Sequence, residues 1–428
     1  MKCSKNICLT LISLLGAATI GLTSCKDQPD EYKSTTGSPE IQYVRLPESA
    51  DSVITKSYLQ TTICLVGKNL RSIRKMLFND QQAVLNTSFI TDNTLVVDIP
   101  KNIPSAVTDK IYMINGDGDT TTYDFHVIVP PPTVSAMSCE YAAAGEDATI
   151  TGDYFIQDPY KPLQVKFNDG ELAVTKIKSI NKNSITFTVP SGAQPGRVYV
   201  ETVYGKSKSQ FVYKDTQNIL FDFDGSHGGL ASGHGWRPGR IRTGGIDGSY
   251  LYLGGATMLG KVGATWDEDD FGMNYWPEPS TGYPELSSIS SFANMLDTCE
   301  INDMALKFEC RVPETSPWSA SALQLIFTGN QDVTSLTANN QYYNSTDIAR
   351  GLWLPWQSTG SFNTGNEWIT VTIPLSAFNK THEGQSAGKT ITKNSMTGFT
   401  LFLWNGGVEG TDCTPELDID NVRVVPMK

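Results

Sequence analysis

The chain has 428 residues, a formal net charge of -12 and an isoelectric point near 4.9. Phosphate backbones and anionic lipid surfaces repel such a chain, so nucleic acid and an anionic membrane face are disfavoured as partners, whereas a neutral ligand is compatible. The length is sufficient for two to four domains.

The N-terminal segment has the features of a secretory signal. Lys2 and Lys5 precede a mostly apolar stretch, residues 7–22, that is too short and too interrupted for a membrane-spanning helix. Leu22-Thr23-Ser24-Cys25 resembles the lipobox of bacterial lipoproteins, which implies removal of residues 1–24 and lipidation of Cys25. Residues 25–38 form a polar, acid-rich tether that is similar to the surface-export signal of Bacteroides-type lipoproteins. We therefore expect a lipid-anchored protein of the outer membrane, exposed at the cell surface.

An internal repeat defines the next part of the chain. Phe78-Asn79-Asp80 recurs identically at Phe167-Asn168-Asp169, and residues 93–100 (NTLVVDIP) match residues 183–190 (NSITFTVP). The spacing predicts two tandem units, at residues 39–130 and 131–214. Alternation of apolar and polar residues within the repeat favours sheets with one solvated face.

The repeat resembles the IPT/TIG family of immunoglobulin-like sandwiches. Besides the segments above, the resemblance rests on the turns Gly67-Lys68-Asn69-Leu70 and Gly152-Asp153-Tyr154-Phe155. It implies spacer domains without a catalytic set, and we interpret both units as a stalk. Pro130-Pro131-Pro132 is expected to stiffen the join between them.

Residues 217–428 have a different residue pattern, in which short segments of alternating apolar and polar residues are separated by loops rich in Gly, Pro and Asn. The segments lie at 219–224, 305–308, 323–327, 369–373, 399–403 and 417–424, and only residues 286–296 have a weak helical pattern. This pattern predicts a jelly-roll-type β-sandwich. The predicted fold class is therefore all-β, with two tandem immunoglobulin-like sandwiches followed by this third domain.

The cysteines beyond Cys25 form no zinc, iron–sulfur or disulfide framework. Cys64 and Cys139 lie in apolar, strand-like surroundings and are predicted to be buried. A bridge between Cys299 and Cys310 stays open.

All eight tryptophans lie beyond residue 235. An indole offers a flat apolar face and one N–H donor, which suits the apolar face and the hydroxyls of a sugar ring. We predict Trp368 to be in the core and Trp236 to anchor a glycine-rich loop, and we leave Trp404 between core and rim. Loops with neighbouring prolines, acids or amides supply the predicted glycan-binding residues. These are Trp266, Tyr275, Trp276, Trp318, Trp356 and Gln357.

The order of these parts resembles that of outer-membrane surface glycan-binding lipoproteins of the B type. Residues 351–356 (GLWLPW) and 368–375 (WITVTIPL) look like the C-terminal binding domain of that family. The resemblance implies non-catalytic binding of a polysaccharide, often a β-glucan or hemicellulose, and no cofactor. It also implies partnership with a SusC/SusD-like complex, that is, a TonB-dependent transporter and its lid.

Two other functions stay open. Glu268, Asp270, Glu278 and Glu285 lie near loop aromatics and could supply the two carboxylates of a surface glycoside hydrolase. The aromatic patch could instead bind another protein, as in an adhesin.

A structural calcium ion is a further alternative. Asp222 and Asp224 lie in the first predicted strand of the C-terminal domain, and Asp418 and Asp420 lie in the last, and these two strands would pair if the sandwich closes in the usual way. We favour simple alternation with outward-facing acids, and therefore predict no metal site.

Overall fold

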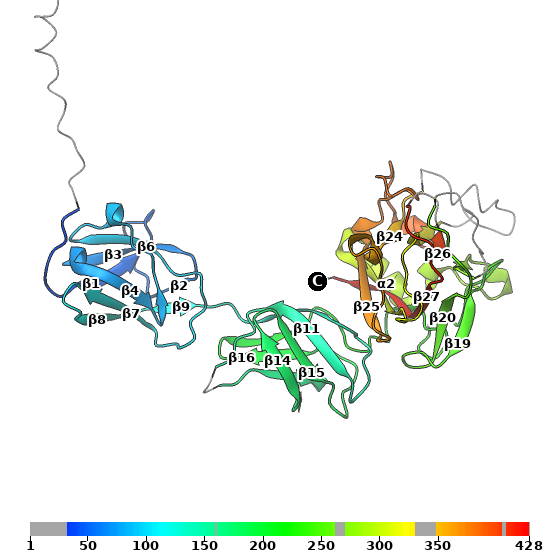
Figure 1. Ribbon diagram of the computed structural model, residues 1–428, viewed down its shortest axis with the longest axis horizontal. Coiled ribbons are helices and arrows are strands. Elements are labelled where there is room, and N and C mark those ends of the chain that lie inside the picture. Colours follow the sequence, from blue (N-terminus) through cyan, green and yellow to red (C-terminus); the bar gives the residue numbers. More distant parts are fainter. Residues whose placement is uncertain (1–31, 159–160, 262–269, 330–347, 405–407, 428) are drawn as a thin grey trace, which may run out of the picture. The chain divides into compact units, whose positions relative to one another are not determined.

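The computed structural model describes residues 32–158, 161–261, 270–329, 348–404 and 408–427, and within these ranges it is all-β apart from one short α-helix (Figure 1). This confirms the predicted fold class. The chain divides into two compact units, residues 1–129 and 130–428.

The first unit is a sandwich of two antiparallel sheets, with strand orders β1-β3-β6 and β5-β4-β7-β8, and a parallel pair, β2-β9. Apolar side chains alternate along the strands, so that Leu95 and Val97 of β6 are buried between the sheets. The strands are β1 (Glu40–Arg45), β2 (Lys56–Tyr58), β3 (Thr62–Lys68), β4 (Ile73–Phe78), β5 (Gln81–Gln82), β6 (Thr94–Asp98), β7 (Lys110–Asn115), β8 (Thr120–Asp124) and β9 (His126–Ile128), with 3₁₀ turns η1 (Leu70–Ser72) and η2 (Thr87–Phe89).

The second unit begins with a similar sandwich, whose sheets have the orders β10-β11-β15-β14 and β13-β12-β16-β17. Phe167, Phe187 and Tyr213 meet edge to face in its core. Its strands are β10 (Thr133–Met137), β11 (Asp147–Asp153), β12 (Gln164–Phe167), β13 (Leu172–Ala173), β14 (Ile177–Asn181), β15 (Ser184–Thr188), β16 (Tyr199–Thr202) and β17 (Gly205–Lys208), with the 3₁₀ turn η3 (Asn168–Gly170).

The rest of the second unit is a larger sandwich. Its sheets are β19-β20-β27-β22-β25, with β18 also paired to β27, and β21-β26-β23-β24. The strands are β18 (Ile219–Phe221), β19 (Arg240–Thr243), β20 (Ser249–Gly254), β21 (Gly272–Tyr275), β22 (Met304–Arg311), β23 (Ala322–Thr328), β24 (Gly351–Trp353), β25 (Ile369–Pro374), β26 (Gly398–Trp404) and β27 (Glu416–Pro426). The predicted helical segment contains η5 (Leu286–Ser288) and the start of helix α2 (Ser290–Thr298), and further 3₁₀ turns are η4 (Pro279–Thr281), η6 (Ile301–Asp303), η7 (Pro355–Ser358), η8 (Leu375–Ala377) and η9 (Lys393–Ser395).

The two sandwiches of the second unit are joined by a buried ion cluster. Glu140 follows β10 of the smaller sandwich, whereas Glu309 and Arg423 lie in β22 and β27 of the larger one, and all three are buried. The Arg423 guanidinium donates to Glu140 Oε2 at 2.7 Å and to Glu309 Oε2 at 2.6 Å. Lys307 Nζ donates to the other oxygen of Glu140. Thr370 Oγ1 donates to Glu309 at 2.8 Å and accepts the Glu140 backbone N–H at 2.7 Å, so each carboxylate is bound from more than one side.

Replacing Arg423 with Met should destabilise the second unit strongly, because Glu309 and Glu140 then remain buried without their shared cation. We expect a loss of about 3–5 kcal/mol in the free energy of unfolding, measured by urea titration. Lys178→Met is the matched control, since Lys178 pairs with Asp147 at the surface, and it should cost less than about 1 kcal/mol. Equal losses in the two variants would contradict a structural role for the cluster.

Candidate functional site

A group of aromatic side chains, two of them exposed, lies beside β21 in the larger sandwich. Trp236 has 49% of its surface exposed and Tyr283 38%, and among the described residues these are the only large apolar side chains of this sandwich that are exposed. Trp236 meets Trp276 edge to face at 5.4 Å, and the His234 ring stacks on Tyr283 at 3.5 Å with 13° between the planes. We call His234, Trp236, Trp276 and Tyr283 the aromatic surface.

The loop that carries Trp236 is fastened to β21 by its backbone. The His234 N–H donates to the Asn274 carbonyl at 2.9 Å, and the Asn274 N–H donates to the Arg237 carbonyl at 2.7 Å. Gly235 between them has φ +113°, and a Cβ there would lie 2.4 Å from the Trp276 ring. Glycine is therefore required for the loop to pass over Trp276, which holds the neighbouring Trp236 at the surface.

Polar side chains border the aromatic surface. Glu278 Oε2 lies 3.6 Å from His234 Nε2, and the Glu278 side chain is half exposed. The Tyr275 hydroxyl donates to the Pro284 carbonyl at 2.6 Å, which fixes the segment between Tyr283 and Glu285 against β21. A carboxylate next to exposed rings can accept hydrogen bonds from ligand hydroxyls.

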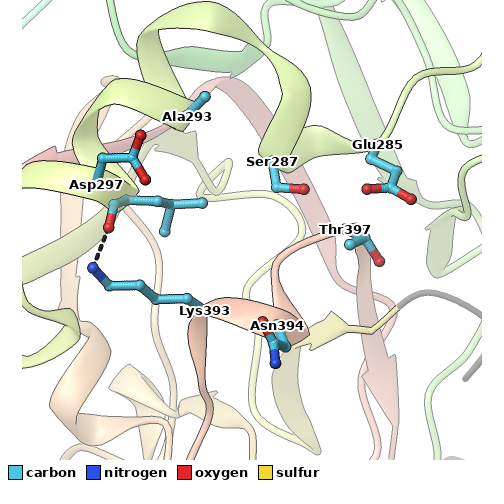
Figure 2. A pocket seen from close by; sticks show the side chains of 8 residues that line it. Glu285, Ser287, Ala293, Asp297, Lys393, Asn394 and Thr397 are labelled. Atoms are coloured by element: carbon cyan, nitrogen blue, oxygen red, sulfur yellow. Dashed lines mark hydrogen bonds between the residues drawn. The ribbon is translucent and has the colours of Figure 1, made fainter.

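A polar pocket of about 590 Å³ begins at Glu285, two residues after Tyr283. It lies between α2 and η9, and Figure 2 shows Glu285, Ser287 and Thr397 toward one side and Asp297 and Lys393 toward the other. The Leu286 N–H donates to the Thr397 carbonyl at 2.9 Å, and Lys393 Nζ donates to the Leu296 carbonyl at the end of α2. The remaining lining residues are Ala293, Leu296 and Asn394. The pocket thus offers carboxylates, an amide and hydroxyls, and one of its lining residues, Glu285, is two residues from Tyr283 in the sequence.

Most of the predicted binding residues are not exposed. Tyr275, Trp276, Trp318 and Trp356 have 2%, 5%, 0% and 6% of their surface exposed, so the prediction that these loop aromatics face solvent is wrong. Gln357 is exposed, as predicted. Trp266 and Glu268 lie outside the described residues, as does Cys25 with the signal segment.

The buried indoles are held by their N–H groups. Trp318 Nε1 donates to the Ala320 carbonyl, and Trp356 Nε1 donates to the Ser321 carbonyl at 2.9 Å. The chain leaves β24 at Leu354 and enters the 3₁₀ turn η7, which turns Trp356 back onto the core. The prolines beside these residues therefore mark turns of the chain and not solvent exposure.

The remaining tryptophans are only half-buried. Trp353 packs among Phe308, Trp318 and Phe362. Trp368 packs against the core of the smaller sandwich, so it contributes to the junction between the two sandwiches. Trp404 lies 5.2 Å from the His382 ring.

Sequence reasoning missed Trp236 and Tyr283. Trp236 was predicted to be a packed anchor because glycines surround it, but Gly235 packs against Trp276 and leaves the Trp236 ring outside. No local signal in the sequence indicates this exposure, because it depends on the pairing of this loop with Tyr275 and Trp276 in the folded sandwich.

The acidic residues considered for calcium do not face outward as predicted. Asp222, Asp418 and Asp420 are buried, and only Asp224 is exposed. Asp222 accepts the N–H groups of Gly225 at 2.7 Å and His227 at 2.8 Å, and Asp418 pairs with Arg311 at 2.7 Å. Within the described ranges, no group of three or more His, Cys, Asp or Glu is placed to hold a metal ion.

The five cysteines beyond Cys25 are free thiols, which answers the open question about Cys299 and Cys310. Cys64 and Cys139 are buried, as predicted, and burial raises the pKa of the Cys139 thiol. No helix of the described residues is long and apolar enough to cross a membrane.

The chain is similar to known surface glycan-binding proteins. The family model described as the surface glycan-binding protein B xyloglucan-binding domain matches residues 213–426, and the IPT/TIG domain model matches residues 132–219. The crystal structure of the surface glycan-binding protein PbSGBP-B from Prevotella bryantii is 37% identical with a TM-score of 0.81, covering 92% of this chain and 100% of that one.

Two further relatives are more distant. SGBP-B from a complex xyloglucan utilization locus in Bacteroides uniformis is 17% identical with a TM-score of 0.43, covering 91% of this chain and 100% of that one. An IPT/TIG domain-containing protein of Bacteroides ovatus is 27% identical over 221 residues, which are 47% of this chain and 44% of that protein. The chain therefore spans less than half the length of this curated relative.

Asp420 provides a pH-dependent test of the buried acids. Burial, followed by the nearby Asp247, raises the pKa of Asp420 to about 9 from 3.8, so the folded chain holds a proton that the unfolded chain has released. The contribution of Asp420 to wild-type stability should therefore fall as pH rises between about 4 and 9. Asp420→Asn removes this titration, and its melting temperature relative to wild type should rise across the same window. The exposed Asp124→Asn is the control, and a pH-independent difference for Asp420→Asn would contradict the prediction.

Proposed function

The chain belongs to the surface glycan-binding protein B family, and from this premise we propose that its C-terminal sandwich binds a polysaccharide by stacking sugar rings on the aromatic surface. The observation that carries the proposal is the exposure of Trp236, whose indole is half exposed although an indole is usually well buried. Membership of the family also places the protein at the cell surface.

Stacking suits this arrangement physically. A pyranose that covers about 100 Å² of indole gains roughly 2 kcal/mol by apolar burial before ordering costs. Trp236 is supported by Trp276 behind it and by a loop bonded to β21, so little freedom is lost when a ligand binds. The nearby Tyr283 provides a second ring, and Glu278 provides acceptors for hydroxyls.

The polar pocket extends the same surface. Because Glu285 is two residues from Tyr283, their Cα atoms lie within about 7 Å of each other. A chain of sugar units that stacks on the aromatic surface can therefore reach Glu285 and then Asn394 in the pocket. Flat rings followed by carboxylate and amide groups match the alternation of apolar faces and hydroxyls in a glycan.

We propose a β-glucan or hemicellulose as the ligand class, with binding and not cleavage as the activity. Of the acids considered for hydrolysis, Asp270 is paired with Arg240, whereas Glu278 and Glu285 border the aromatic surface and the pocket. Release of reducing sugar from a polysaccharide panel by the purified chain would favour the hydrolase instead.

We also propose how the protein is anchored and which uptake complex it serves. The lipobox-like segment ending at Cys25 supports anchoring by lipid in the outer membrane. Family membership supports capture of the glycan for a SusC/SusD-like uptake complex. Several weak contacts along a long polymer would then act together to retain it at the surface.

Trp236→Ala should weaken polysaccharide binding by about tenfold or more, since the stacking face is removed. Isothermal titration calorimetry with soluble xyloglucan and mixed-linkage glucan measures the change. Tyr58→Ala is the control, because Tyr58 is an aromatic residue with 59% exposure in the first unit. Unchanged affinity of Trp236→Ala for every glycan that the wild type binds would remove the aromatic surface as the site.

Asn394→Ala should weaken binding of long oligosaccharides a few-fold, by about 1 kcal/mol for one lost hydrogen bond. The shortest oligosaccharides that still bind should be unaffected, because they occupy the aromatic surface alone. Titration of a series of increasing length distinguishes the two, with the exposed Asn363→Ala as control. Equal losses at every length would show that the pocket is not an extension of the site.

A further inference from the structure

The two copies of the repeat, which are the first unit and the smaller sandwich of the second unit, differ at one sheet edge. In the second unit, β15 lies between β11 and β14. Its counterpart in the repeat is β6, which is the last strand of the sheet β1-β3-β6 in the first unit (Figure 1). One copy of the repeat therefore covers this edge with its own strand, and the other copy does not.

The difference arises in the segment before each strand. In the second unit this segment forms β14, with Ile180 opposite Ile185 and Ile177 opposite Phe187, and the Thr188 N–H donates to the Lys176 carbonyl at 2.9 Å. The pairing continues along the whole length of β15.

In the first unit, only the beginning of the equivalent pairing to β6 is formed. Ile90 bridges Leu95, and the Thr91 N–H donates to the Thr94 carbonyl at 2.8 Å. The preceding residues form the 3₁₀ turn η2, which Asn86 caps by accepting the Ser88 N–H at 3.1 Å. The outer edge of β6 beyond Leu95 therefore has no strand partner within the described residues.

Apolar side chains surround the open edge. A groove of about 790 Å³ runs along Val96 and Asp98 of β6, and its other side carries Val84 and Phe89, which are 88% and 57% exposed. Of the large apolar side chains with high exposure among the described residues, five lie in the first unit and none in the smaller sandwich of the second. Exposed apolar groups beside an unpaired strand mark a surface that binds a partner.

We propose that this edge binds an extended peptide segment of another protein, which adds as an antiparallel strand to β6. The Thr188 N–H of β15 points toward β14, and the repeat places Asp98 at the same position. Because backbone direction alternates along a strand, the N–H and C=O groups of Val96 and Asp98 face outward. A peptide matches this row of donors and acceptors, whereas a polysaccharide has no such row.

The side chains of β14 indicate which side chains the bound peptide should carry. Its Ile177 and Ile180 pack against the core of their sandwich, whereas Lys178 faces solvent. Ile177 and Ile180 lie on one face although they are three residues apart, because the register of β14 shifts between Ile177 and Ser179. Apolar side chains of the bound peptide would likewise pack against Val84 and Phe89.

The test uses amide hydrogen exchange in the full chain, which contains its own control. The Val96 and Asp98 amides should exchange at least tenfold faster than the equivalent Thr186 and Thr188 amides. A synthetic peptide with the sequence of residues 175–182 (TKIKSINK), which includes β14, should slow the Val96 and Asp98 amides about tenfold at saturation and leave Thr186 and Thr188 unchanged. The same peptide with proline in place of its serine lacks one N–H and should have no effect.

Phe89→Asp should weaken the peptide effect without unfolding the unit, because Phe89 is mostly exposed. Four outcomes would overturn the proposal. The Val96 and Asp98 amides could already be protected in the free chain; the peptide could give no protection at millimolar concentration; protection could depend on protein concentration alone, which indicates a second copy; or only a soluble polysaccharide could protect them.

Discussion

The position of the larger sandwich on its neighbour depends on one buried cluster of charged side chains. Arg423 lies in β27, the strand that pairs with β18, β20 and β22, and its guanidinium is shared between Glu309 of the same sheet and Glu140 of the neighbouring sandwich. Burial raises the pKa of Glu309 to about 7, against the opposing effect of Arg423. Such a cluster contributes less to stability than to geometry, since any displacement leaves a buried charge unpaired. It therefore fixes how the sandwich that carries the aromatic surface sits on the smaller sandwich of the same unit.

Much of the fold could be predicted from the sequence because it depends on short-range patterns. Alternation such as Ile185 and Phe187 identifies strands, and the repeated Phe-Asn-Asp segments identify two related units. The difference between β14 and η2 could not be predicted, since the two segments stand at the same place in the repeat. That choice depends on whether a local turn capped by Asn86 competes successfully with strand pairing.

The binding site was harder to predict than the fold. A tryptophan beside prolines was expected to face solvent, yet Trp318 and Trp356 turn inward, where carbonyl groups accept their N–H donors. Exposure of an indole depends on which distant segment covers it, and that information is not local. The burial of the acids of β27 could not be predicted for the same reason, because Asp418 pairs with Arg311 only once β22 and β27 are joined in the sheet.

The uneven exposure of the indoles has a spectroscopic consequence. Of the described tryptophans, Trp236 is the most exposed, whereas Trp318 is fully enclosed. A water-soluble collisional quencher such as acrylamide therefore reaches the Trp236 ring far more readily than the enclosed ones. Intrinsic fluorescence of the unlabelled protein thus contains a reporter located on the aromatic surface itself.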